Sequence, residues 1–198
     1  PHWKCGQEAS IRVLHTITTA WILGQEQSPE SSLTEFIAMH LKRIETTLSY
    51  AIGQQNNHGT SEAAALFVGG SFLAGHHPKA STWTTKGRGW LEKLGVKLFQ
   101  KDGSFSQYSV NYHRLALDTY SLAEAWRAHI NQPVFSGDLL SRIAMATSWL
   151  CNLTDYSTGD APNIGANDGA HIIPLTNCGY RDFRPSIQLA SNLFMGVS

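Results

Sequence analysis

Apolar residues recur at helical spacing along almost the whole of this 198-residue chain. In residues 7–24, for example, Ile11, Leu14, Ile17 and Trp21 fall on one face of a helix with 3.6 residues per turn. The same period predicts further helices over 32–53, 60–74, 79–99, 109–129 and 137–153, and a last helix that starts near Pro185. Because no segment alternates apolar and polar residues in the manner of a strand, the predicted fold class is all-α.

The ends of the predicted helices carry local signals. Ser32-Leu33-Thr34-Glu35 has the pattern of a capping box at the start of the second helix, and Gly53 suits its end. Asn56-Asn57 suits the start of the third helix, where side-chain oxygens accept hydrogen bonds from free backbone N–H groups. Glu8 and Arg12 are four residues apart, which predicts an ion pair on the first helix.

Six or seven helices of about 18 residues, joined by short turns, are typical of antiparallel helical hairpins. No repeat of the kind found in helical arrays links the pairs. The pattern therefore favours one domain over residues 1–198, an incomplete (α/α) toroid whose polar loops gather at one end and form a cleft. Small residues on the third helix, such as Gly70, would let a neighbouring helix approach closely. Residues 155–184 form a long Gly-, Pro-, Asn- and Asp-rich loop, and loops of this length are usually functional.

The composition excludes several classes of partner. Acidic and basic residues balance at 15 each, so no basic face for nucleic acid is expected. No run of 18 apolar residues exists, so no membrane span is expected. Cys5, Cys151 and Cys178 show no metal-ligand spacing, and their odd number leaves at least one thiol free. The aromatic residues, among them Trp83 and Trp90 on one predicted helix, fit either a core or a carbohydrate-stacking surface.

Asn57 and His58 stand where a polar segment runs into the third predicted helix. A carboxamide can donate to a sugar carboxylate, and an adjacent imidazolium can share its charge. The start of a helix adds a positive partial charge at the same place. The alternative is structural, namely a helix cap beside one exposed histidine.

Tyr112 follows a turn at residues 102–104 and stands at the start of another amphipathic helix. A phenol with its ordinary pKa of about 10 is a poor base unless nearby cations lower that pKa. His113, Arg114 and His58 are the available cations, and one of them beside the hydroxyl would let Tyr112 act as general base and acid. The alternative is a partly buried tyrosine whose hydroxyl lies at the rim of the helix.

Hydrolysis of a glycosidic bond would instead need two carboxylates across a cleft. Glu62, Asp102, Asp160 and Asp168 are candidates, although none has a diagnostic spacing. Asp168 belongs to the segment 163–169, which has strong turn chemistry and does not match the oxygen spacing of a calcium loop.

Taken together, these strings resemble the heparinase II/III-like polysaccharide lyases, which include alginate and oligoalginate lyases. The matching strings occur in the family's order over roughly residues 3–195. They are Cys5-Gly6-Gln7-Glu8-Ala9 with Ile11-Arg12, Asn56-Asn57-His58 with Glu62-Ala63-Ala64, Asp102-Gly103-Ser104 with Tyr112-His113-Arg114, and Pro162-Asn163-Ile164-Gly165 with Asp168-Gly169.

The resemblance implies a helical toroid followed by antiparallel β-sandwich domains, with the substrate cleft between them. This chain then represents the toroid part, and the sandwich is a missing partner. The resemblance assigns neutralisation of the uronate carboxylate to Asn57, assistance to His58, and the general base and acid to Tyr112. We further expect substrate contacts from a second group of residues. They are Arg114, His113, Glu62, Asn167 and Asp168.

The implied reaction is β-elimination on an acidic, uronate-containing polysaccharide, and the implied location is periplasmic or secreted. The chain departs from the family in having Ser61, followed by Glu62, where family members commonly place an acidic residue. A further histidine and a structural zinc site come from the sandwich, so no cofactor or metal is expected in this chain. With one wall of the cleft missing, we expect little activity from the chain alone.

Two other interpretations stay open. One is an (α/α)-toroid glycoside hydrolase that uses a carboxylate pair such as Glu62 and Asp168. The other is a non-catalytic helical domain for carbohydrate binding or assembly, in which the polar helix ends are only caps. The loop of residues 155–184 provides a geometric test, because its turns, with His171, Tyr180 and Arg181, should border the same cleft as Tyr112, and residues 163–171 should not pack far from Tyr112.

Overall fold

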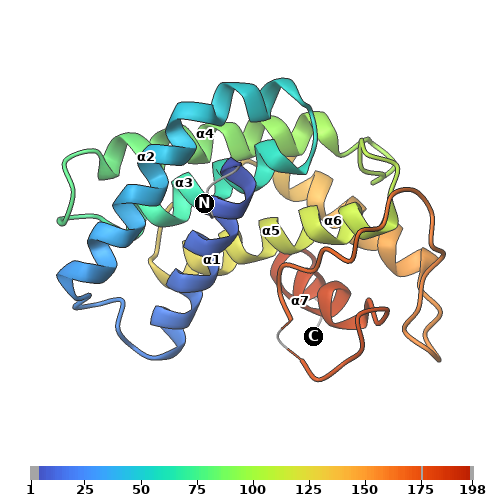
Figure 1. Ribbon diagram of the computed structural model, residues 1–198. Helices are drawn as coiled ribbons and strands as arrows, with labels where there is room; N and C mark the ends of the chain where they lie inside the picture. The colour runs from blue at the N-terminus through green and yellow to red at the C-terminus, as the bar shows by residue number, and fades with distance from the viewer. Residues whose placement is uncertain (1–4, 175, 197–198) are drawn as a thin grey trace. The chain divides into compact units, whose positions relative to one another are not determined.

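The computed structural model describes residues 5–174 and 176–196, and the regular structure of these residues is helical (Figure 1). The helices are α1 (Gly6–Ile22), α2 (Ser31–Gly53), α3 (Asn57–Phe72), α4 (Ala80–Leu98), α5 (Val110–His129), α6 (Gly137–Leu153) and α7 (Arg184–Phe194). Phe99 and Phe105 form an isolated antiparallel bridge. The all-α prediction is therefore confirmed. No helix in the described part of the chain is long and apolar enough to cross a membrane.

The chain divides into two compact units, Pro1–Leu91 and Glu92–Ser198, with the division inside α4. The first unit contains α1, α2, α3 and the beginning of α4, and the second contains the end of α4 with α5, α6 and α7. The toroid arrangement, the single domain and the missing sandwich stay predictions.

In the first unit, α1, α2 and α3 pack against one another in pairs. Helix α3 is buried on almost all sides, since Ala63, Ala64, Ala65, Leu66 and Phe67 are all inaccessible to solvent. Its small residues allow close contact, as predicted. A Cβ added to Gly70 would lie 2.5 Å from the Thr84 backbone nitrogen on α4.

The approach of α4 to α3 predicts a large stability effect at Gly87. A Cβ there would lie 2.6 Å from the Ala63 carbonyl oxygen and would also overlap the backbone of Phe67. Because backbone cannot rotate away, Gly87→Ala should destabilise the protein by about 1–3 kcal/mol. Gly89→Ala on the same helix is the matched control, since nothing lies within 4 Å of its added Cβ.

Gly89→Ala should be neutral or stabilising, by up to about 1 kcal/mol, because alanine is the better helix former. The free energy of unfolding of both variants would be measured by urea denaturation. Equal stabilities for the two variants would contradict the close packing of α3 on α4.

Trp83 belongs to the core of the first unit. It is fully buried, its indole Nε1 donates to Glu45 Oε2 at 3.0 Å, and its ring stacks on His77 with 4.6 Å between ring centroids. A role for Trp83 as a sugar platform is thus wrong. The predicted Glu8–Arg12 pair is present, with Arg12 Nη2 3.8 Å from Glu8 Oε2.

The capping box predicted at the start of α2 is wrong. The helix begins at Ser31 and its cap residue is Glu30, which makes no side-chain capping hydrogen bond. Since the cap lies two residues before the predicted one, Ser32 is already in the first turn, where its hydroxyl is 3.4 Å from Glu30 Oε2. The Thr34 hydroxyl donates to the Ser31 carbonyl oxygen at 2.9 Å instead.

In the second unit, α5, α6 and α7 pack pairwise. Helix α5 is buried along most of its length, including polar residues, so its sequence lacks a wide polar face. Tyr120 and Leu139 lie directly against Gly95 at the end of α4. The loop between α6 and α7 returns to the first turn of α5, where the Val110 N–H donates to the Ile164 carbonyl oxygen at 3.1 Å.

Candidate active site

Asn56, rather than Asn57, is the cap of α3. The Asn56 side-chain oxygen accepts a hydrogen bond from the His58 backbone N–H at 2.9 Å. Asn57 is the first residue of the helix and is buried, with 3% of its surface exposed. The capping interpretation therefore explains Asn56 but not the Asn57 side chain.

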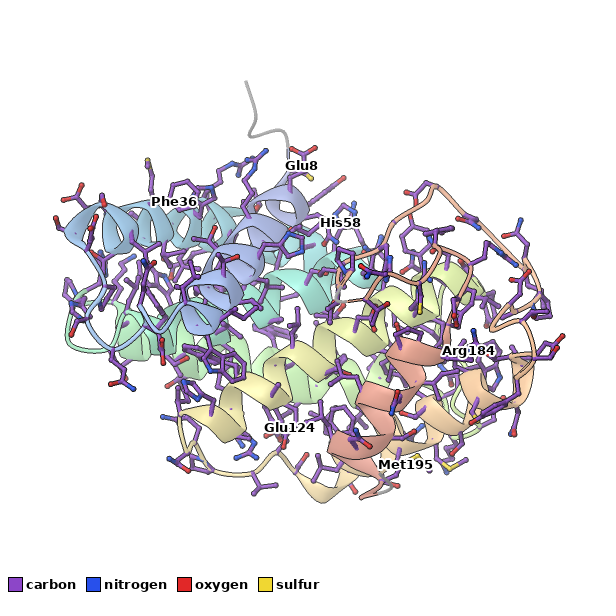
Figure 2. All side chains as sticks on the ribbon, turned by 90° about the horizontal axis from the view of Figure 1, so that it is seen from below. Glu8, Phe36, His58, Glu124, Arg184 and Met195 are labelled. Atoms are coloured by element: carbon purple, nitrogen blue, oxygen red, sulfur yellow. The ribbon has the colours of Figure 1, made fainter. Side chains whose placement is uncertain are left out.

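His58 lies in the first turn of α3 and is half-buried (Figure 2). Burial lowers the pKa of His58 below its ordinary value of 6.5, so the ring is neutral at pH 7. A neutral imidazole still has one N–H donor, but it does not supply the positive charge that the sequence interpretation gave it.

Glu62 is buried one turn further along α3, with 2% of its surface exposed. Its carboxylate lies against the first residue of α1, because a Cβ on Gly6 would be 2.7 Å from Glu62 Oε2. Burial raises the pKa of Glu62 to about 7, and the charge of Arg43 opposes this rise. The position of Glu62 supports a role in packing α3 against α1.

Tyr112 lies in the first turn of α5, half-buried, and its hydroxyl donates to Asp168 Oδ2 at 2.7 Å. Ser109 caps this helix by accepting from the Tyr112 backbone N–H at 3.1 Å. The hydrogen bond to Asp168, with burial and the carboxylate charge, raises the pKa of Tyr112 to about 12. The same bond lowers the pKa of Asp168. In this conformation Tyr112 is therefore a protonated donor.

The cations expected beside the Tyr112 hydroxyl have other partners. His113 is buried, with its Nε2 2.9 Å from the Ala146 carbonyl oxygen and its ring stacked on Trp149 at 4.6 Å between centroids. Burial lowers the pKa of His113 to about 4, so it is neutral. The interpretation of His113 as an available cation is therefore wrong.

Arg114 is also buried. Its Nη1 donates to the Tyr180 carbonyl oxygen at 2.6 Å, and its Nη2 donates to Asn111 Oδ1 at 3.3 Å. Its guanidinium carbon lies 4.6 Å from the Tyr180 ring centroid and 4.5 Å from that of Phe183. These contacts fasten the loop and α7 to α5, so the positions of Arg114 and His113 support structural roles. Substrate contacts from either residue stay a prediction.

The 155–184 loop lies against Tyr112, as the sequence predicts. Asn111, which the sequence interpretation missed, links the two, since its Nδ2 lies 3.4 Å from Asp168 Oδ1. The Tyr180 hydroxyl lies 2.5 Å from Asn111 Oδ1 and 2.6 Å from Asn167 Oδ1, so it donates to one of these oxygens. The His171 ring packs edge-on against Tyr180. Asn111 carries only a weak sequence signal, a polar residue in the first turn of a buried helix.

Both helix starts follow a residue in the left-handed backbone region. Gln55, two residues before Asn57, has φ 53°, and Tyr108, four residues before Tyr112, has φ 50°. This conformation is uncommon for residues other than Gly, Asn and Asp, and such backbone strain concentrates at functional sites. Asn57 belongs to the Pro1–Leu91 unit and Tyr112 to the Glu92–Ser198 unit, so their convergence on one cleft stays a prediction.

Asp168→Asn should lower the pKa of Tyr112 from about 12 toward the ordinary value of about 10, because the largest cause of the shift is removed. The titration would be followed by the ring-carbon NMR signal of Tyr112. Asp155→Asn is the control, since Asp155 lies in the same loop but its side chain accepts from Ser157. An unchanged Tyr112 titration in Asp168→Asn would contradict the hydrogen bond.

The family model for the heparinase II/III N-terminus matches residues 3–167. These residues include α1 to α6 and the first part of the loop between α6 and α7. No curated protein and no solved structure matches the chain. Because the match covers most of the chain, this protein belongs to the heparinase II/III family and corresponds to its N-terminal part.

Proposed function

We propose that this chain supplies the helical part of the active site of a polysaccharide lyase that cleaves a uronate-containing polysaccharide by β-elimination. The family match over residues 3–167 carries the proposal, because Asn57, His58 and Tyr112 all lie within it. The positions of these residues in the first turns of α3 and α5 add support, since helix starts favour anionic ligands.

In the proposed reaction, the Asn57 amide donates to the C6 carboxylate of the uronate, and the neutral His58 ring contributes one further N–H. Withdrawing negative charge from the carboxylate makes the C5 proton acidic enough to be removed. Tyr112, as phenolate, takes that proton, and the C5 electron pair forms the C4–C5 double bond. The C4–O4 bond breaks, and the Tyr112 phenol returns its proton to O4.

Asp168 has a defined place in this scheme. While the Tyr112 hydroxyl donates to Asp168, the pKa of the phenol is about 12 and almost no phenolate exists at neutral pH. The base step therefore requires the Asp168 contact to break when substrate binds. We propose that the uronate residue displaces Asp168 from the hydroxyl, which couples activation of the phenol to substrate binding.

Hydrolysis is the second candidate, and one observation favours it. A general acid needs a carboxyl with a raised pKa, and burial raises that of Glu62 to about 7. The carboxyl of Glu62 is, however, packed against Gly6 at the start of α1. We therefore rank hydrolysis below elimination.

The decisive experiment is product analysis. The protein in its full natural length, and the 198-residue chain, would be incubated with alginate, heparin and hyaluronan. Elimination produces a conjugated double bond that absorbs ultraviolet light. The absorbance should therefore rise in proportion to the number of new reducing ends. New reducing ends without that absorbance would establish hydrolysis. Binding of a polysaccharide by the full-length protein without any new ends would establish a non-catalytic domain.

A further inference from the structure

A cavity of about 540 Å³ lies in the second unit, beside α5 and α7. Its wall contains an apolar part and a polar part drawn from α5, the loop and α7. The lining residues are Asp118, Ile173, Thr176, Cys178, Asp182, Arg184, Pro185, Ser186, Gln188, Leu189 and Asn192. None of them is a residue of the proposed lyase site.

Asp118 is the unusual member of this wall. It lies in the middle of α5 and is 1% exposed, and among the described residues neither carboxylate oxygen makes a geometrically complete hydrogen bond, although the Ser186 hydroxyl interacts with the carboxylate. Burying a carboxylate without such partners is costly, and buried polar groups are almost always hydrogen-bonded. A buried and unsatisfied carboxylate in the wall of a cavity therefore indicates a missing donor.

The two arginines nearest Asp118 make their hydrogen bonds to other groups. Arg184, at the start of α7 (Figure 2), pairs with Asp182 through Nε–Oδ1 at 2.9 Å and Nη2–Oδ2 at 2.7 Å. Arg114, four residues before Asp118 on α5, attracts the carboxylate by its charge, but no ion pair joins the two. Its Nη groups donate to Tyr180 and Asn111, and its Nε is buried without a hydrogen-bond partner among the described residues. Asp118 is thus without an ion-pair partner among the described residues, and only the Ser186 hydroxyl and the charge of Arg114 act on its carboxylate.

We propose that this cavity binds a small organic cation, a primary ammonium or guanidinium on a short apolar chain, with its charged end on Asp118. The ammonium or guanidinium would supply the charged donors that the carboxylate lacks. Ile173, Pro185 and Leu189 would contact the apolar chain. The Ser186 hydroxyl, also in the wall, gives a bound cation a further acceptor.

Binding should strengthen with pH. Burial raises the pKa of Asp118 to about 7, while a Ser186 hydroxyl interaction and the Arg114 charge partly oppose it. Since a cation prefers the ionised carboxylate, its affinity should rise about tenfold between pH 6 and pH 8. The Asp182–Arg184 pair does not titrate in this range, and Cys178, the remaining titratable group of the wall, is exposed.

The test uses the 198-residue chain and two probes of equal size, n-butylguanidinium and the neutral n-butylurea, in calorimetric titrations at pH 6 and pH 8. The cation should bind at least about tenfold more tightly than the urea at pH 8. Asp118→Asn should weaken cation binding roughly 10- to 100-fold, the range for a lost charge-assisted hydrogen bond. Asp138→Asn, an exposed carboxylate at the start of α6, is the control and should leave it unchanged.

A second variant keeps Asp118 intact, so it tests the cavity even if Asp118→Asn does not fold. Leu189→Trp narrows the cavity from α7 and should also abolish cation binding, with the helical circular dichroism retained. Equal binding of the cation and the urea, absence of binding by the cation, or unchanged binding in a folded Asp118→Asn or Leu189→Trp variant would each overturn the proposal.

Discussion

Replacing Tyr112 with Phe is expected to lower the rate of β-elimination by roughly 10²- to 10⁴-fold, the usual contribution of a general acid–base. The substitution removes one oxygen, which in the structure donates only to Asp168 among the described residues. Stability should therefore change little, and KM should change less than kcat. The rate would be measured as ultraviolet absorbance of the unsaturated product, in the protein's full natural length.

Tyr108→Phe is the matched control for this experiment. Tyr108 precedes the same helix by two residues and is 77% exposed, so loss of its hydroxyl should leave the rate unchanged. A Tyr112→Phe enzyme that turns over at the original rate would show that another group removes the C5 proton.

Replacing Asn57 with Ala is expected to lower kcat about 10²- to 10³-fold, or about 2.7–4 kcal/mol, because one preorganised donor to the developing enolate is lost. The hydrogen bond from the Thr60 hydroxyl goes to the Asn57 backbone carbonyl, at 2.9 Å, and survives the substitution. Binding assays provide a further check. Asn57→Ala and the unsubstituted protein should have the same affinity for a carboxyl-reduced polysaccharide, since the amide is proposed to contact the carboxylate.

Asn56→Ala separates this effect from loss of the helix cap. Asn56 is the side chain that caps α3, so its removal should cost about 1 kcal/mol of unfolding free energy and leave kcat nearly unchanged. If Asn56→Ala lowered kcat as much as Asn57→Ala, both effects would come from the helix end, and the role of Asn57 as a donor would be wrong.

Helices were the part of the structure that local sequence predicts well. A 3.6-residue apolar period is a property of neighbouring residues, and it located helices α1 to α7 to within a few residues, including the start of α7 near Pro185. The cap of α3 was predicted from an equally local signal, the Asn56-Asn57 pair at the start of the helix. The error at α2 arose because Ser32 can either cap a helix or lie in its first turn, and the alternative start at Ser31 was the one adopted.

The contacts around Tyr112 were harder to predict, because they join distant parts of the chain. Asp168 lies 56 residues beyond Tyr112, and the sequence indicated that the loop approaches the helix but not which side chain meets the hydroxyl. The result reversed the expected charge, since a carboxylate rather than a cation sets the phenol's pKa. Burial was the other missing quantity, and it makes His58 and His113 neutral.

In the proposed lyase site Asn57 and Tyr112 bind one ligand, and NMR titration with a uronate oligosaccharide tests this directly. Signals of the Asn57 side-chain amide and the Tyr112 ring would be followed in the same samples. We predict that both shift with a single Kd, that the Tyr112 pKa falls as the Asp168 contact breaks, and that the carboxyl-reduced oligosaccharide shifts neither signal. Shifts of only one residue, or two different Kd values, would contradict a shared site.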